Sequence, residues 1–239
     1  MTRTVVIPDT HVPFHDRAAW RKLLKYCEDT SPEAVVLLGD FMDFHALSQH
    51  RKNEQWLDNL KREINAGKKG LAQLRAANPK AEIRYIEGNH ELRWSTYFLN
   101  KAPVMRLLNM GWETALDLAA LDIKLQRPNK PTWIPAGAGE RVAAYHGHEM
   151  KGSLTKPAAH ALRMAENLGY NVHIGHGHKM GLLVGKSGNK EVFGVEGGSL
   201  VQRKSIGFDY LGNKVVPWWV GWQVYDSRRK QPYPEFVRA

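Results

Sequence analysis

Five short blocks of aspartate, asparagine and histidine recur along this chain, each just after an apolar run. The blocks are Asp9-Thr10-His11, Gly39-Asp40-Phe41-Met42-Asp43, Gly88-Asn89-His90-Glu91, His146-Gly147-His148 and Gly175-His176-Gly177-His178. The apolar runs are short, are rich in β-branched residues and end at turn residues, which is typical of buried strands. Because α/β sheets bind their ligands at the carboxyl ends of strands, we expect the five blocks to meet at one edge of the fold.

Between the blocks, the apolar spacing is typical of amphipathic helices. Apolar residues step by three or four positions from Trp56 to Leu74, and Pro79 ends the pattern. The same spacing predicts further helices over residues 20–26, 97–121 and 157–168. After Gly181 the pattern changes to alternation around turns, which predicts strands in the C-terminal third. The expected fold class is therefore mixed α/β (α+β).

Length and composition indicate one domain over residues 1–239, because no stretch separates two composition regimes. The longest apolar runs are far shorter than the roughly 18 residues of a membrane span, and the N-terminus lacks the pattern of a signal peptide. Cys27 is the only cysteine, which excludes an intramolecular disulfide and fits a reducing compartment. We expect a cytoplasmic protein with no membrane partner, and the sequence does not indicate an oligomeric state.

The charge balance favours an anionic partner. The chain has 34 lysines and arginines against 24 aspartates and glutamates, a formal net charge of +10, and a basic surface attracts phosphates. The basic residues are dispersed, which is typical of solvated surfaces. The charge therefore indicates an anionic, phosphate-bearing partner, and a nucleic acid is one possibility.

The donor atoms of the blocks suit a pair of divalent metal ions. A two-metal hydrolytic centre needs a bridging carboxylate, neutral imidazoles and open positions for water. Asp40 is the candidate bridge, because the glycine before it lets the backbone approach the ions closely. Asp9 and His11 are at positions i and i+2 of an extended segment, so both can reach one metal. His176 and His178 have the same spacing and can share one ion or bind one each.

The five motifs occur in the order D-x-H, G-D-x-x-D, G-N-H-E, H-G and G-H-x-H. In this order they resemble the motifs of the calcineurin-like metallophosphoesterases over residues 9–178. The resemblance implies a β-sandwich flanked by helices, a metal site at the carboxyl ends of strands, and hydrolysis of a phosphate ester by a metal-bridging hydroxide. It implies that one metal is held by Asp9, His11, Asp40 and His178. It implies that the other is held by Asp40, Asn89, His146 and His176.

The resemblance also implies roles for residues beside the ligands. His90 is expected to donate a proton to the leaving alkoxide or to stabilise the transition state. Asp43 and Glu91 are expected to orient imidazoles such as His90 and to fix their tautomers. The His-Gly-His block leaves open which ring binds the metal, with His146 preferred to His148.

The second block departs from the family pattern in a way that bears on the substrate. Phe44 and His45 stand where phosphoprotein phosphatases have an Arg-Gly pair, whose arginine grips the phosphomonoester. We therefore favour a phosphodiesterase acting on small nucleotide diesters such as cyclic nucleotides. Asn89, His45 and Arg93 are the expected substrate contacts. The alternatives are a phosphomonoesterase of phosphoprotein or nucleotide type, a nuclease, and a binding module without turnover.

Mixed oxygen and nitrogen donors suit Mn²⁺, the expected metal, and also Fe²⁺, Zn²⁺ or Mg²⁺.

Outside the blocks, Trp218, Trp219 and Trp222 form an aromatic cluster. We expect these residues to pack in the core of a late hairpin, and a base-stacking surface is the alternative. The Gly197–Ser199 segment is expected to be a turn near the site, because it lacks the lysine and the following helix of a phosphate loop.

Overall fold

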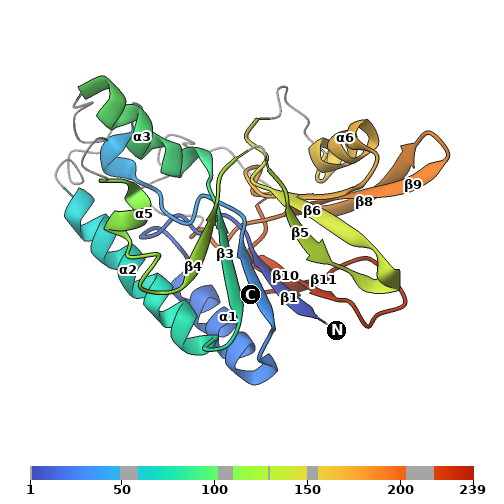
Figure 1. The fold of residues 1–239 in the computed structure, drawn as a ribbon, viewed down its shortest axis with the longest axis horizontal. Helices are drawn as coiled ribbons and strands as arrows, with labels where there is room; N and C mark the ends of the chain where they lie inside the picture. The colour runs from blue at the N-terminus through green and yellow to red at the C-terminus, as the bar shows by residue number, and fades with distance from the viewer. Residues whose placement is uncertain (1, 49–58, 102–109, 129, 150–155, 203–217) are drawn as a thin grey trace.

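The computed structural model describes residues 2–48, 59–101, 110–128, 130–149, 156–202 and 218–239 (Figure 1). These residues form two β-sheets that pack face to face, with helices on the outer side of each sheet. The predicted class, a β-sandwich flanked by helices, is confirmed.

The first sheet has six strands in the order β11-β10-β1-β2-β3-β4. Its strands are β1 (Arg3–Ile7), β2 (Ala34–Leu37), β3 (Glu82–Ile86), β4 (Ile123–Gln126), β10 (Gly221–Asp226) and β11 (Glu235–Arg238). The four strands from β1 to β4 are parallel, whereas β10 is antiparallel to both of its neighbours. The parallel strands therefore bring the chain segments that follow β1, β2 and β3 to one edge.

The second sheet has five strands in the order β5-β6-β7-β9-β8. Its strands are β5 (Thr132–Pro135), β6 (Arg141–Tyr145), β7 (Asn171–Ile174), β8 (Met180–Ser187) and β9 (Lys190–Gly197). The central strands β6, β7 and β9 are parallel, and β5 and β8 run antiparallel at the two edges.

Alternation along the strands divides the apolar side chains among three layers. In β1, Val5 packs in the layer that also contains side chains of the outer helices, whereas Val6 packs between the two sheets. In β6, Ala144 packs between the sheets and Ala143 packs with side chains of α6. Strands buried on both faces read as continuous apolar runs, which explains why the sequence predicts them well.

Five α-helices surround the sheets in the described part of the chain. They are α1 (Arg17–Thr30), α2 (Leu60–Ala77), α3 (Asn89–Lys101), α5 (Trp112–Ala115) and α6 (Ala159–Leu168). Figure 1 shows α1, α2, α3 and α5 on the side of the first sheet and α6 on the side of the second. The helix predicted over 20–26 is confirmed as the central part of α1, and the helix predicted over 157–168 is confirmed as α6, which begins two residues later than predicted. The helix predicted from Trp56 is α2, and Trp56 itself lies outside the described residues.

The helix predicted over residues 97–121 is wrong in its bounds. Helix α3 begins at Asn89, because the backbone N–H of His90 donates to Asp40 Oδ1 over 2.9 Å and so has a partner at the helix start. Among the described residues from 110 to 121, the α-helical part is the four-residue α5, and the backbone has positive φ at Asp117 and at Asp122. Residues 102–109 lie outside the described residues. Among the helices that the structure describes, none combines the length and apolar character needed to cross a membrane.

Candidate metal centre

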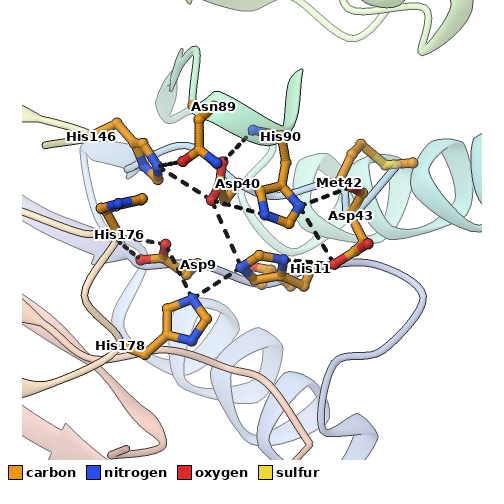
Figure 2. Close-up of polar contacts among 12 residues, drawn as sticks. Asp9, His11, Asp40, Met42, Asp43, Asn89, His90, His146, His176 and His178 are labelled. Atoms are coloured by element: carbon orange, nitrogen blue, oxygen red, sulfur yellow. Dashed lines mark hydrogen bonds and ion pairs between the residues drawn. The ribbon is translucent and has the colours of Figure 1, made fainter. Parts of the chain in front are cut away.

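All five polar blocks lie just after the carboxyl ends of parallel strands, as predicted. Asp9 follows β1, Asp40 follows β2 and Asn89 follows β3 in the first sheet. His146 follows β6 and His176 follows β7 in the second sheet. Figure 2 shows these side chains pointing toward one another across the junction of the two sheets.

Strained backbone recurs at the expected metal ligands. Four residues of the expected ligand set have positive φ, namely His11 (51°), Asp40 (48°), His176 (61°) and His178 (56°). For residues other than glycine, this left-handed conformation costs about 1–3 kcal/mol each and persists where surrounding contacts impose it. Such strain at residues of matching chemistry supports a functional site.

Donor atoms converge in three groups, each with its atoms within 4.8 Å of one another. The groups are Asp9 with His11 and His178, His11 with Asp40 and His90, and Asp40 with His146 and His176. Asp40 Oδ2 lies 3.3 Å from His146 Nε2 and 3.8 Å from His11 Nε2. Asp40 thus lies between the first and third groups, as a bridging carboxylate must.

The first group contains two imidazole nitrogens that face each other. His11 Nε2 lies 3.1 Å from His178 Nε2, and His178 Nε2 lies 3.6 Å from Asp9 Oδ1. His11 Nδ1 donates to Asp43 Oδ2 over 2.9 Å, which leaves the lone pair of Nε2 directed at the group. Burial lowers the pKa of both His11 and His178, so the rings are neutral near pH 7. Neutral imidazole is the form that binds a metal ion.

The third group is built around His146. Its Nδ1 donates to the carbonyl of Leu38 over 2.8 Å, so in the neutral ring, the form that binds a metal ion, Nε2 keeps its lone pair. That lone pair faces Asn89 Oδ1 at 2.9 Å and Asp40 Oδ2 at 3.3 Å, which places three acceptor atoms together. A cation among them satisfies all three, so the residues fit a metal ion. The exposed His176 ring completes the group, 5.2 Å from the His146 ring between centroids.

Charge in the centre also favours a cation. Burial raises the pKa of Asp9 to about 8. Burial opposes ionisation of Asp40 as well, but the imidazoles of His146 and His90 hold its pKa well below the usual range. In His146, Asp40 outweighs burial and raises the pKa to about 10. Buried carboxylates are stable when ionised only with a positive partner, which a proton on His146 or a metal ion supplies.

Glycine is required at two places in the centre. A Cβ atom on Gly39, where φ is +93°, would lie 2.6 Å from His146 Nδ1. A Cβ atom on Gly177, between the two histidines of the last block, would lie 1.9 Å from Glu196 Oε1. At Gly39 the positive φ and the close approach to His146 both require glycine, whereas at Gly177 a side chain would displace the carboxylate of Glu196.

Glu91 differs from its expected role of orienting an imidazole. Its Oε2 accepts from the backbone N–H groups of Asp40 and Gly88, both over 2.9 Å. Its Oε1 accepts from the N–H of Met42 over 3.0 Å and from the Tyr85 hydroxyl over 2.6 Å. The fully buried carboxylate thus holds the backbone of the second block. The reason is its position in the first turn of α3, which directs the side chain at the end of β2.

His90 is held between Asp43 and Arg93. His90 Nδ1 lies 2.9 Å from the carbonyl oxygen of Asp43 and 3.5 Å from Asp43 Oδ2, so the expected link between Asp43 and His90 is present. Burial lowers the pKa of His90, but Asp40 and Asp43 outweigh it and the net pKa is raised. Arg93 Nη2 lies 3.0 Å from His90 Nε2 and Nη1 donates to the Asp43 carbonyl over 3.0 Å. Because a guanidinium only donates, Nε2 accepts here and Nδ1 carries the hydrogen.

A cavity of about 290 Å³ opens onto the centre. The described residues that line it are His11, Asp40, Asn89, His90, His176, Gly177, His178 and Trp218. Asn89 is thus both beside His146 and in the cavity wall, as expected of a ligand that also contacts substrate. Arg93 lies behind His90 rather than in the lining.

His45 and His148 lie beside the centre. The His45 ring is 8% exposed and its Nδ1 lies 3.9 Å from Asp43 Oδ1, outside the described cavity lining. The predicted contact between His45 and substrate therefore has no support in this geometry. The His148 ring lies 5.3 Å from the His146 ring, and none of the three donor groups includes it. This agrees with the preference for His146.

Sequence reasoning missed two buried residues that shape the site. Glu63 of α2 accepts the N–H groups of His45 and Ala46, both over 2.9 Å, and so fixes the segment after Asp43. The sequence feature that could have indicated this role is a charged residue on the apolar side of a predicted helix. Such a residue is rarely buried unless its charge has partners. Trp218 lines the cavity, although its cluster was expected in the core.

Comparison with known proteins gives one family match. The family described as "Calcineurin-like phosphoesterase" matches residues 2–180. The Gene 54 proteins of Mycobacterium phages L5 and D29 are 27% and 28% identical to this chain, each over 98% of this chain and 92% of the relative. A single mutant of Vps29 from Entamoeba histolytica is 15% identical over 99% of both chains, with a TM-score of 0.49.

Proposed function

The chain belongs to the calcineurin-like phosphoesterase family, and we propose that it is a phosphodiesterase that uses two divalent metal ions to hydrolyse small nucleotide diesters. The family activity, hydrolysis of phosphate esters, agrees with the His/Asp groups at the strand ends. The preference for diesters, the number of metals and their identity are the parts that we propose.

One observation carries the preference for diesters. Among the described residues that line the cavity, there is no lysine and no arginine. Arg93, the nearest candidate in sequence, donates through Nη1 to the Asp43 carbonyl, its Nη2 lies 3.0 Å from His90 Nε2, and it is not among the described residues that line the cavity. A forked arginine is the group that best neutralises a dianionic phosphomonoester. A diester has one negative charge and needs less neutralisation.

The proposed ligands form two sets that share Asp40. The first set is Asp9, His11, Asp40 and His178, and the second is Asp40, Asn89, His146 and His176. Two divalent ions in these sets would acidify a water molecule and neutralise charge on the phosphate. The mixed nitrogen and oxygen donors suit Mn²⁺, which we propose as the metal. Asp43 and the Leu38 carbonyl keep two of the imidazoles in the tautomer that binds metal.

His90 is the proposed proton donor to the leaving oxygen. Its raised pKa, caused by Asp40 and Asp43 acting against burial, favours the protonated ring. A protonated Nε2 and the guanidinium of Arg93 would place two donors face to face at 3.0 Å. An ester oxygen bound beside His90 would accept from the protonated Nε2 in place of this contact, so substrate binding and protonation of His90 would favour each other.

The substrate class is tested with two esters that release the same product. Turnover of bis-p-nitrophenyl phosphate and of p-nitrophenyl phosphate is measured in Mn²⁺, with a chelator as the metal control. We expect a higher kcat/KM for the diester, and no turnover of either ester after chelation. A strong preference for the monoester would contradict the diester assignment and favour the phosphomonoesterase.

A nuclease is the second candidate, and the net charge of +10 favours it. Single-stranded DNA and RNA are offered as substrates at increasing salt concentration. A nuclease that binds the phosphate backbone through many cations loses activity steeply as salt rises. Turnover of small diesters that is insensitive to salt, without cleavage of the polymers, supports the small-substrate assignment.

A further inference from the structure

The aromatic cluster predicted for the core is divided by the structure into three environments. Trp222 is 2% exposed and packs in the core near Tyr26, as predicted. Trp219 is 42% exposed and packs against the guanidinium of Arg238. Trp218 points to the metal centre, where its ring lies 4.6 Å from the His178 ring in an edge contact. The prediction of core packing is therefore wrong for Trp219, whereas Trp218 is buried, at 8% exposure, but also lines the cavity at the metal centre.

Trp218 is the one apolar side chain among the described residues that line the cavity. The other described side chains there belong to aspartate, asparagine and histidine, whose polar atoms converge on the proposed metals. At about 290 Å³ the cavity is at the small end of ligand pockets, which measure roughly 300–1,000 Å³. A phosphate bound by these polar atoms would leave its attached alcohol group to meet the indole in so small a space.

Backbone hydrogen bonds fix the position of Trp218 relative to the metal centre. The next residue, Trp219, donates its N–H to the carbonyl of His178 over 3.3 Å and accepts from the N–H of Ser199 over 2.9 Å. Leu200, which follows Ser199, donates to the carbonyl of Asp9 over 2.9 Å. The Gly197–Ser199 segment thus lies near the site, as expected, and links the indole to two proposed ligands.

We propose that Trp218 is a specificity-determining residue that contacts the alcohol part of the ester and favours an alcohol with a planar aromatic ring, such as a nucleoside. This inference rests on the proposed binding of a phosphate ester at the metal centre. An indole makes apolar and stacking contacts with any base, because every base has an aromatic face. The contact selects for the presence of a ring and not for one base.

Two ligands that differ only by a base isolate this contact. Binding of adenosine 5′-monophosphate and of ribose 5-phosphate to the Mn²⁺-loaded protein is measured by titration calorimetry. We expect the wild-type protein to bind the nucleotide about tenfold more tightly, the lower part of the range for one aromatic contact with a base. Trp218→Leu is expected to abolish this difference, and the matched control Trp219→Leu is expected to keep it.

Several results would overturn the inference. One is equal affinity of the wild-type protein for the two ligands, and another is an unchanged affinity ratio in Trp218→Leu. Equal loss of affinity for both ligands would mean that Trp218 acts only by holding His178. If Trp218→Leu does not fold, Trp218→Phe, which keeps a ring beside His178, takes its place. This variant must lower the ratio of the two affinities by a smaller factor. An unchanged ratio counts against the contact. Because binding needs no turnover, the ratio is informative even if the protein prefers monoesters.

Discussion

At the scale of single residues, the centre depends on which nitrogen of each imidazole carries the hydrogen. Asp43 fixes His11 and the Leu38 carbonyl fixes His146, each through Nδ1. Both rings therefore present Nε2 to the metal groups. His90 differs, because its Nε2 meets Arg93 instead of a carboxylate at hydrogen-bond distance. These partners support the proposed division of roles, with His11 and His146 as metal ligands and His90 as proton donor.

His90→Gln tests the role of proton donor. We expect kcat for a diester with an alkyl leaving group to fall by about 10²–10⁴, the usual contribution of a general acid. The loss should be smaller for a p-nitrophenyl leaving group, because nitrophenolate leaves readily without a proton. Metal content, measured by mass spectrometry, should stay the same. An unchanged kcat with the alkyl ester would show that another group donates the proton.

At the scale of elements, α2 supports the segment that follows the second block. Glu63 is buried on this helix and accepts two backbone N–H groups from residues 45 and 46. Burial raises its pKa to about 7, Asp43 contributes in the same direction, and the two N–H groups oppose the shift. The folded chain therefore holds the proton of Glu63 more strongly than the unfolded chain, in which the pKa is about 4.5.

The pKa of Glu63 makes stability depend on pH. The stabilisation from its protonation is complete below pH 4.5 and is lost as pH rises through about 7. In the wild-type protein, this loss lowers the free energy of unfolding between pH 4.5 and 7.5. The side chain of Glu63→Gln stays neutral, so we expect its free energy of unfolding to fall by about 2–3 kcal/mol less over the same interval. Urea unfolding at the two pH values measures the difference. Glu28 is exposed, so the stability of Glu28→Gln should depend on pH as that of the wild type does. If the free energy of unfolding changes equally with pH in all three proteins, the raised pKa of Glu63 is contradicted.

The elements also show what the sequence can predict. Strand ends and the polar blocks after them are local patterns, so the positions of Asp9, Asp40 and His146 follow from sequence alone. The contacts of Glu91 and Trp218 depend on chain segments distant in sequence, and no spacing rule reports them. The start of α3 was missed for the same reason, because Asp40 supplies the partner for its first turn.

At the scale of the whole molecule, the metal centre joins the two sheets. Asp9 and Asp40 follow strands of the first sheet, whereas His146 and His178 follow strands of the second. Metal ions held by both sets would therefore cross-link the two halves of the sandwich. Unfolding the sandwich separates these donors, so a metal that binds only the folded chain stabilises the whole fold.

Metal binding should therefore raise the melting temperature. At a free Mn²⁺ concentration 100 times Kd, linkage supplies about 2.7 kcal/mol per site, which is roughly 5–10 °C for a chain of this length. Asp40→Asn weakens the shared ligand and should remove most of the shift, whereas the exposed Asp29→Asn should keep it. Scanning calorimetry with and without chelator measures the change.

A melting temperature independent of Mn²⁺ in the wild-type protein would contradict a metal site that spans both sheets. A shift that survives in Asp40→Asn would instead remove Asp40 as the bridge, because the remaining ligands of each set would then suffice to bind the ions.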